Sequence, residues 1–214
     1  MRRVLALCLL ASVTALAQEK AASEKVAKDR EATTFNEIER GLHLAVSAGL
    51  WATINPPAGT GSARYFLLGQ AARVEFGYDF GERFSLALFA QATANRAGSD
   101  YTGKSQDPVS GAPRASGDYT EFIPGLTARL SLVGLNDSQD VKRSWFYIRA
   151  GAGYVIYQPR ALLPVPDVLV FAGPGFEYFT KLRHFSIGLE AVFNAQVLTA
   201  SFGFAVTPML RYAF

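Results

Sequence analysis

The chain has 214 residues, half of them apolar, and a formal net charge of +3 at pH 7. Its length fits a single domain of ordinary size. Beyond residue 17, no apolar run approaches the roughly 20 residues of a membrane-spanning helix. The small net charge does not indicate a nucleic-acid partner.

The first 17 residues have the pattern of a cleaved secretory signal. The basic residues Arg2 and Arg3 precede an apolar stretch, and Ala15 and Ala17 form a small-x-small cleavage site. Cleavage would remove Cys8, which is the only cysteine, so the mature protein would form no disulfide and no thiolate site. Loss of the two arginines would also lower the net charge to +1.

After the signal, the chain changes character twice. Residues 18–40 are polar and carry charges of both signs, which indicates a periplasmic tether or a frayed helix. From residue 41 onward, apolar side chains alternate with small or polar ones. Apolar residues occupy every second position from Leu42 to Ile54, as in a strand with one apolar face, and Asn55-Pro56-Pro57 ends the pattern.

The same alternation recurs in seven further segments. The predicted strands are residues 66–78, 84–95, 121–132, 146–156, 168–178, 185–194 and 200–214. Residues 97–117 are the longest predicted loop, and residues 133–144 are a second polar connection. Pro124, Pro174 and Pro208 interrupt strands and predict local bulges. We therefore expect an all-β fold over residues 41–214, an eight-stranded antiparallel barrel with up-and-down meander topology.

Three features favour a transmembrane barrel over a soluble one. Aromatic residues of the apolar face gather near both strand ends, as in interfacial girdles. The other face combines charges with many glycines. The last strand ends on Leu210, Tyr212 and Phe214, which resembles the C-terminal signal recognised by the outer-membrane barrel-assembly machinery. These features predict an outer-membrane protein in contact with lipid, and the even strand number predicts that both termini are periplasmic.

The face opposite the apolar one carries four arginines and four glutamates. The lumen of an eight-stranded barrel is only wide enough to be filled by side chains. Opposite charges there would pair, because an unpaired buried charge is costly. The sequence therefore predicts a plugged lumen with a charge network formed by Arg73, Glu75, Glu121, Arg129, Arg149, Glu177, Glu190 and Arg211.

The two histidines are the candidate residues for a catalytic or a metal site. His184, Ser186 and Glu190 have the residue types of a base, a nucleophile and an orienting carboxylate. However, they follow a periplasmic turn and face the lumen, so we interpret them as structural. His43 has no cysteine or clustered histidine to complete a metal site. The sequence predicts a protein that is not an enzyme and that has no cofactor or metal.

Several stretches carry a resemblance to known proteins. They are residues 94–96 with 99–103, residues 137–141, residues 167–175, residues 182–186 and the ending at residues 202–214. Over most of residues 36–214 the chain resembles the myxobacterial adventurous gliding motility outer-membrane proteins of the CglE type, within the small OmpA-like barrel superfamily. The resemblance implies a non-enzymatic part in an envelope-spanning gliding machine with other envelope proteins as partners.

Two segments are candidate contacts for such partners. The long loop carries Tyr101, Lys104, Asp107 and Arg114 and would meet a surface partner, or it is merely disordered. The connection at residues 133–144 carries Asp137, Asp140, Lys142 and Arg143 and would meet a periplasmic partner, or it is a solvated turn. A generic adhesion or envelope-integrity barrel and a narrow pore remain alternative functions.

Overall fold

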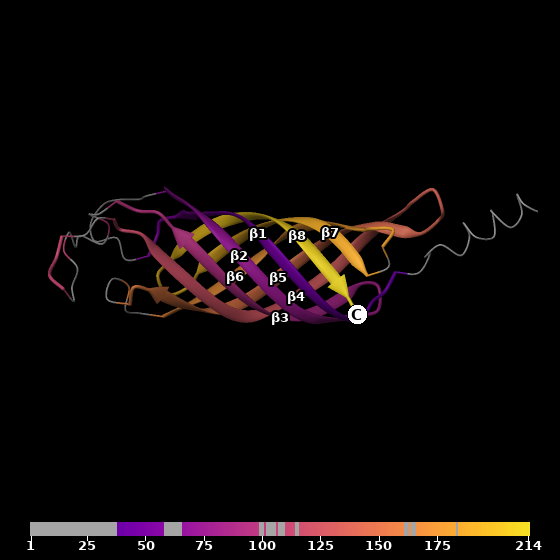
Figure 1. Ribbon diagram of the computed structural model, residues 1–214, viewed down its shortest axis with the longest axis horizontal. Coiled ribbons are helices and arrows are strands. Elements are labelled where there is room, and N and C mark those ends of the chain that lie inside the picture. Colours follow the sequence, from indigo (N-terminus) through magenta and orange to yellow (C-terminus); the bar gives the residue numbers. More distant parts are fainter. Residues whose placement is uncertain are drawn as a thin grey trace, which may run out of the picture. The chain divides into compact units, whose positions relative to one another are not determined.

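A computed structural model describes residues 38–57, 66–98, 101, 106, 110–113, 116–160, 163, 166–182 and 184–214. The predicted signal at residues 1–17 and most of the predicted segment at residues 18–40 lie outside them. The strands are β1 (Leu42–Ile54), β2 (Phe66–Phe80), β3 (Phe84–Asn95), β4 (Tyr119–Asn136), β5 (Lys142–Gln158), β6 (Asp167–Phe179), β7 (Phe185–Gln196) and β8 (Ser201–Ala213). They form a closed antiparallel barrel in chain order (Figure 1), which confirms the predicted fold.

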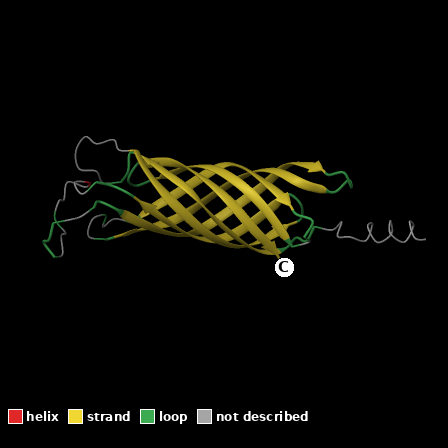
Figure 2. Ribbon diagram, turned by 45° about the horizontal axis from the view of Figure 1, so that its top comes forward, coloured by secondary structure: helices red, strands yellow, loops and turns green. Residues whose placement is uncertain are grey.

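The barrel has two distinct ends. Leu44 of β1 pairs with Phe76 of β2 and with Tyr212 of β8, so both ends of the barrel-forming chain lie at one end, called the terminal end. The turns after β2, β4 and β6 lie there as well. The connections that follow β1, β3, β5 and β7 leave from the opposite end, called the loop end (Figure 2).

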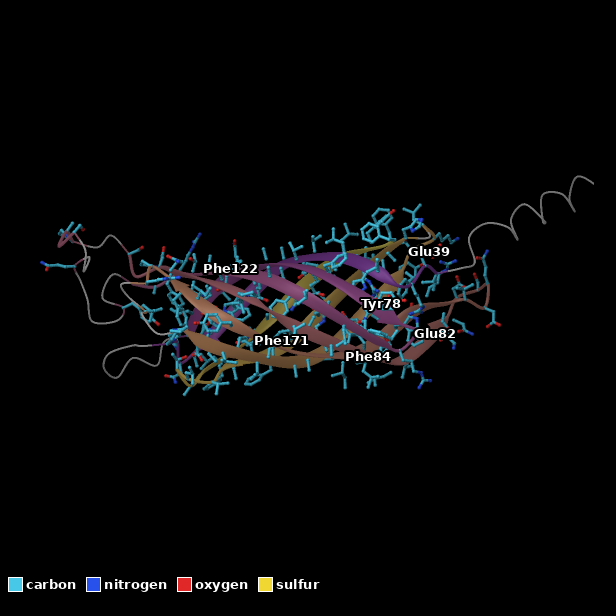
Figure 3. The ribbon with its side chains drawn as sticks, turned by 90° about the horizontal axis from the view of Figure 1, so that it is seen from below. Glu39, Tyr78, Glu82, Phe84, Phe122 and Phe171 are labelled. Atoms are coloured by element: carbon cyan, nitrogen blue, oxygen red, sulfur yellow. The ribbon has the colours of Figure 1, made fainter. Side chains whose placement is uncertain are left out.

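Side chains alternate between an apolar outer face and a buried lumen. In β2 the alternation is unbroken from Phe66 to Phe80. The outer face carries large apolar side chains that are about half exposed. Such a surface is stable in contact with lipid hydrocarbon and unfavourable in contact with water. Its aromatic residues include Tyr78 and Phe84 toward the terminal end and Phe122 toward the loop end (Figure 3). Among the described residues, no helix is long and apolar enough to cross a membrane.

The connection predicted at residues 133–144 is mostly strand. β4 runs on to Asn136 and β5 begins at Lys142, so only residues 137–141 form the turn. The pairing of β3 with β4 ends at Phe84 and Leu130, and the two longer strands continue beyond it. Residues 132–143, called the β4–β5 hairpin, therefore project past the terminal end (Figure 2). The sequence prediction is wrong here because the register shifts between Ser131 and Val133 and again between Leu135 and Asn136, which interrupts the alternation.

The bulges predicted at the prolines are wrong. At Pro208, the ladder to β1 omits two pairs and then resumes in the same register, while Leu189 of β7 pairs with the proline on the other side. Pro124 and Pro174 follow the same pattern. A missing amide proton opens the ladder on one side only, so no extra residue is needed.

Candidate functional site

The middle of the lumen holds a group of ion pairs, called the central ion cluster. Arg73 Nε lies 2.7 Å from Glu75 Oε1, and Arg149 Nε lies 3.0 Å from Glu190 Oε1. Arg73 also contacts Glu190, and Arg149 contacts Glu75. The Tyr147 hydroxyl donates a hydrogen bond of 2.6 Å to Glu190. Two arginines and two glutamates thus alternate in a closed, charge-balanced ring.

A second group, called the terminal ion cluster, lies nearer the terminal end. Arg129 Nη1 lies 2.5 Å from Glu177 Oε2, and Arg211 Nη1 lies 3.2 Å from Glu177 Oε1. Arg211 also contacts Asp79, whose Oδ1 lies 3.7 Å from Arg129 Nη2. The Ser186 hydroxyl donates to Glu177 at 2.5 Å. Burial makes each partner dependent on the others, because an unpaired charge there has no water to solvate it.

Glu121 was predicted to belong to the charge network, but it lies outside both ion clusters. Its two oxygens accept hydrogen bonds from Gln196 Nε2 at 2.7 Å and from Thr93 Oγ1 at 2.8 Å. No cation of the described residues pairs with it, although it is only 1% exposed. The fourth carboxylate is instead Asp79, which lies one residue beyond the predicted strand at residues 66–78. Asp79 continues the lumen-facing parity of Arg73 and Glu75, so alternation alone would have found it.

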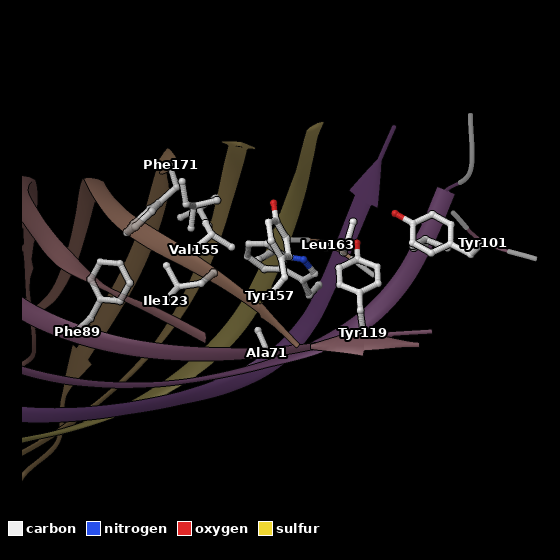
Figure 4. Packing of buried hydrophobic residues seen from close by; sticks show 14 residues of the cluster. Ala71, Phe89, Tyr101, Tyr119, Ile123, Val155, Tyr157, Leu163 and Phe171 are labelled. Carbon is white, nitrogen blue, oxygen red and sulfur yellow. The ribbon is translucent and has the colours of Figure 1, made fainter. Parts of the chain in front are cut away.

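The loop half of the lumen holds a cluster of buried apolar and aromatic side chains beside the polar contacts of Glu121. Phe89 and Phe171 meet edge to face, with ring centroids 5.6 Å apart (Figure 4). Ile123 and Val155 pack in the same cluster and are fully buried. This layer is not predicted from the sequence, because alternation does not reveal lumen positions where both faces of a strand are apolar. Charged and apolar layers thus occupy successive parts of the lumen, and the void between the two ion clusters is about 10 Å³.

Tyr101 closes the loop end of this layer. Its ring stacks on Tyr119 with a centroid distance of 5.6 Å, and its hydroxyl donates to the carbonyl of Pro57. It is only 3% exposed, and burial raises the pKa of its hydroxyl. The prediction that Tyr101 meets a surface partner is therefore wrong. Lys104, Asp107 and Arg114, which were predicted with it, lie outside the described residues.

Arg143 connects the β4–β5 hairpin to the barrel through hydrogen bonds. Its Nε donates to Asp137 Oδ2 at 2.7 Å, and its Nη1 donates to the carbonyl of Thr180 at 3.0 Å. Because Arg143 is buried, the prediction that it contacts a partner is wrong. The other predicted residues of this segment, Asp140 and Lys142, are exposed.

Asp137 organises the turn of the hairpin. Its Oδ1 accepts hydrogen bonds from the amides of Gln139 at 2.8 Å and Val141 at 3.1 Å. Desolvation alone would raise the pKa of this carboxyl, but the Val141 and Gln139 amides and Arg143 outweigh it and lower the pKa below its usual value. The turn is thus built around an ionised carboxylate.

Both histidines contact other residues of the barrel. The His184 ring stacks on Tyr212, and its Nδ1 lies 2.8 Å from the carbonyl oxygen of Ala213. The Ser186 hydroxyl is bound to Glu177, so His184 and Ser186 are not a base and nucleophile pair. His43 faces the lumen, and its Nδ1 lies 3.7 Å from Asp79 Oδ1. In the part of the chain that the structure describes, no group of histidine, cysteine or acidic residues could hold a metal ion.

The predicted C-terminal signal lies on and beside the outer face. Leu210 and Phe214 are exposed there, and the Tyr212 ring meets those of Phe185 and Phe214 at 5.0 and 5.1 Å. These rings lie among the aromatic side chains of the outer face toward the terminal end, which are called the aromatic belt.

No model of a known protein family matches the chain, and no curated protein matches it. Among solved structures, the chain is similar to Neisserial surface protein A, with 11% identity over 83% of this chain and 100% of that one, and a TM-score of 0.56. Weaker likenesses are to Ail, the attachment invasion locus protein of Yersinia pestis (12% identity, 81% and 99% covered, TM-score 0.42), and to the outer membrane enzyme PagL (13%, 79% and 99%, 0.43). The first likeness shows the fold alone, a barrel of the small outer-membrane type.

Proposed function

We propose that the chain is a non-enzymatic barrel of the outer membrane that acts as a scaffold and does not transport solutes. The filled lumen is the observation that carries this proposal. Two charge-balanced ion clusters and an aromatic layer occupy the interior from the terminal end to the loop end. Opening a path would separate buried ion pairs or displace packed aromatic side chains, and both changes are costly.

The scaffold role follows from what remains accessible. The apolar outer face contacts lipid, and the two ends present different surfaces to two compartments. We place the termini and the β4–β5 hairpin in the periplasm, after signal-dependent export and insertion by the barrel-assembly machinery. Other envelope proteins are then the partners of the two ends.

The specific proposal is that this scaffold belongs to a cell-surface gliding motility complex. It rests on the sequence resemblance given above, and the solid barrel is compatible with it because a motility scaffold needs anchorage and no channel. A generic adhesion or envelope-integrity barrel is the alternative from the same fold. A narrow pore is the second alternative, and the filled lumen disfavours it.

Two experiments test this. Purified protein in planar bilayers should give no stepwise conductance, and stable open channels would contradict the scaffold proposal. A deletion strain should lose surface movement and regain it with the wild-type chain, and crosslinking should recover envelope partners. Normal movement of the deletion strain would exclude the motility assignment and leave the generic barrel.

A further inference from the structure

The β4–β5 hairpin has one open backbone edge. The amide of Ser131 donates to the carbonyl of Arg83 at 2.7 Å, and beyond this bond β3 no longer accompanies β4. Residues 133–136 then pair with β5 on one side only, and Leu132 is the unpaired residue of a register shift. Among the described residues, no strand lies on the other side. Such an edge offers unpaired amides and carbonyls to another extended chain.

The same stretch is apolar on its outward face. The register shifts between Ser131 and Val133, and the extra residue turns Leu132, Val133 and Leu135 outward together. These three side chains are 47%, 52% and 50% exposed. Val133 pairs with Phe146, whose ring packs on Phe176 in the aromatic belt. Leu135 pairs with Ser144, two residues farther toward the turn of the hairpin. The hairpin that carries these side chains projects past the terminal end (Figure 2), so their apolar surface gains by being covered.

The hairpin is held in place before any partner arrives. Its turn is fixed by Asp137 and its base by Arg143. The Trp145 indole donates to the carbonyl of Lys142 at 3.0 Å, and the Arg40 guanidinium lies over the Trp145 ring at 5.5 Å. These contacts cover the lumen-side face of the hairpin. A preformed edge lowers the ordering cost of binding.

We propose that residues 132–136 bind an extended segment of a periplasmic partner protein, which joins β4 as an additional strand and places alternate apolar side chains against Val133 and Leu135. This deepens the scaffold function proposed above and rests on it. A two-stranded ribbon has no groove for a helix, whereas its free backbone groups match those of a strand. The open edge lies on the side of β4 that faces β3 farther along the strand.

Site-specific photocrosslinking in the producing cells tests the pairing. A benzophenone amino acid replaces Leu132, Val133 or Leu135 in turn, and Lys181 and Ala97 serve as reference positions at the two ends. Strand addition predicts that the crosslinked residue on the partner moves steadily along one extended segment as the probe moves along β4. A helical spacing of three or four residues, adducts to a second copy of this chain, or lipid adducts alone would overturn it.

The outcomes separate this inference from the scaffold proposal. A partner that is crosslinked at Lys181 or Ala97 but not along β4 would overturn the strand addition and leave the scaffold standing. The absence of protein adducts at all five positions would overturn both.

Charged variants give an independent readout. Val133→Lys and Leu135→Lys should each reduce the adduct yield at Leu132 roughly tenfold, because lysine on a sheet edge opposes pairing. Leu198→Lys is the matched control, since Leu198 is similarly exposed and lies at the loop end. Retained gel mobility of the unboiled protein shows that each variant is folded. Unchanged yield in the folded hairpin variants would contradict the proposal.

Discussion

Arg129 Nη1 of β4 lies 2.5 Å from Glu177 Oε2 of β6, although β5 separates the two strands in the sheet. The contact therefore crosses the lumen. Glu177 also receives Arg211 from β8, so one carboxylate connects three strands through the interior. A small barrel is narrow enough for such contacts, and they stabilise it as a solid body.

Glu177→Gln should destabilise the barrel strongly. The substitution keeps the side-chain shape but leaves Arg129 and Arg211 with only Asp79 as an anionic partner. Loss of one partner from a buried ion pair costs about 3–5 kcal/mol. Urea unfolding of the protein in lipid vesicles, followed by tryptophan fluorescence, measures the loss.

Glu82→Gln is the control for this variant. Glu82 pairs with Lys142 at 3.6 Å, but both side chains are more than half exposed. Exposed pairs contribute about 0–1 kcal/mol, so this variant should unfold close to the wild type. Equal losses in the two variants would contradict the assigned importance of the terminal ion cluster.

Glu121→Gln should behave differently from Glu177→Gln despite equal burial. Glu121 has no cationic partner among the described residues, and its neighbours are the neutral side chains of Gln196 and Thr93. A glutamine keeps one acceptor and leaves no arginine unpaired. We expect a change in unfolding free energy of less than about 1.5 kcal/mol, the size of one neutral hydrogen bond. A loss as large as that of Glu177→Gln would show that Glu121 belongs to the ion network after all.

The strands and their faces could be predicted from the sequence because one face contacts hydrocarbon. That contact excludes polar side chains from the outer face, so a period of two appears, as in β2 from Phe66 to Phe80. The lumen-facing positions follow from parity. Seven of the eight predicted network residues indeed lie in the two ion clusters.

What the sequence could not supply is the position of each residue along and across the barrel. Glu121 and Glu177 have the same parity, but only the strand register brings Glu177 to Arg129. The alternation likewise does not show that Phe89 and Phe171 face the lumen, because both faces of their strands are apolar at these positions. The β4–β5 hairpin was missed because its two register shifts interrupt the alternation of strand faces.

Gly175→Ala should loosen the central ion cluster. Gly175 pairs with Tyr147 across β5 and β6, and a Cβ at this glycine would lie 2.6 Å from the Tyr147 hydroxyl oxygen and against its ring. The ring must then move away from Glu190, to which it donates a hydrogen bond. Overpacking of this kind costs about 1–3 kcal/mol in unfolding free energy.

A double-variant cycle isolates the cause. In a Tyr147→Leu background the ring is absent, so Gly175→Ala should add little to the loss already present. Full additivity of the two changes would mean that Gly175 acts through the backbone and not through Tyr147.

The turn of the β4–β5 hairpin should loosen at acidic pH. The pKa of Asp137 is lowered in the folded protein. Its contribution to the stability of the turn is therefore complete above the usual carboxyl pKa of about 3.9, and it is lost as the pH falls through the lower pKa of the folded protein. Protonation removes the charge that Arg143 and the amides of Gln139 and Val141 bind. Hydrogen exchange of these two amides, expressed as protection factors between pH 6 and pH 2, should show protection falling at the acidic end. Asp137→Asn should exchange faster at neutral pH and lose the pH dependence, and because Asn keeps the side-chain shape, unchanged protection in this variant would show that the carboxylate charge does not hold the turn.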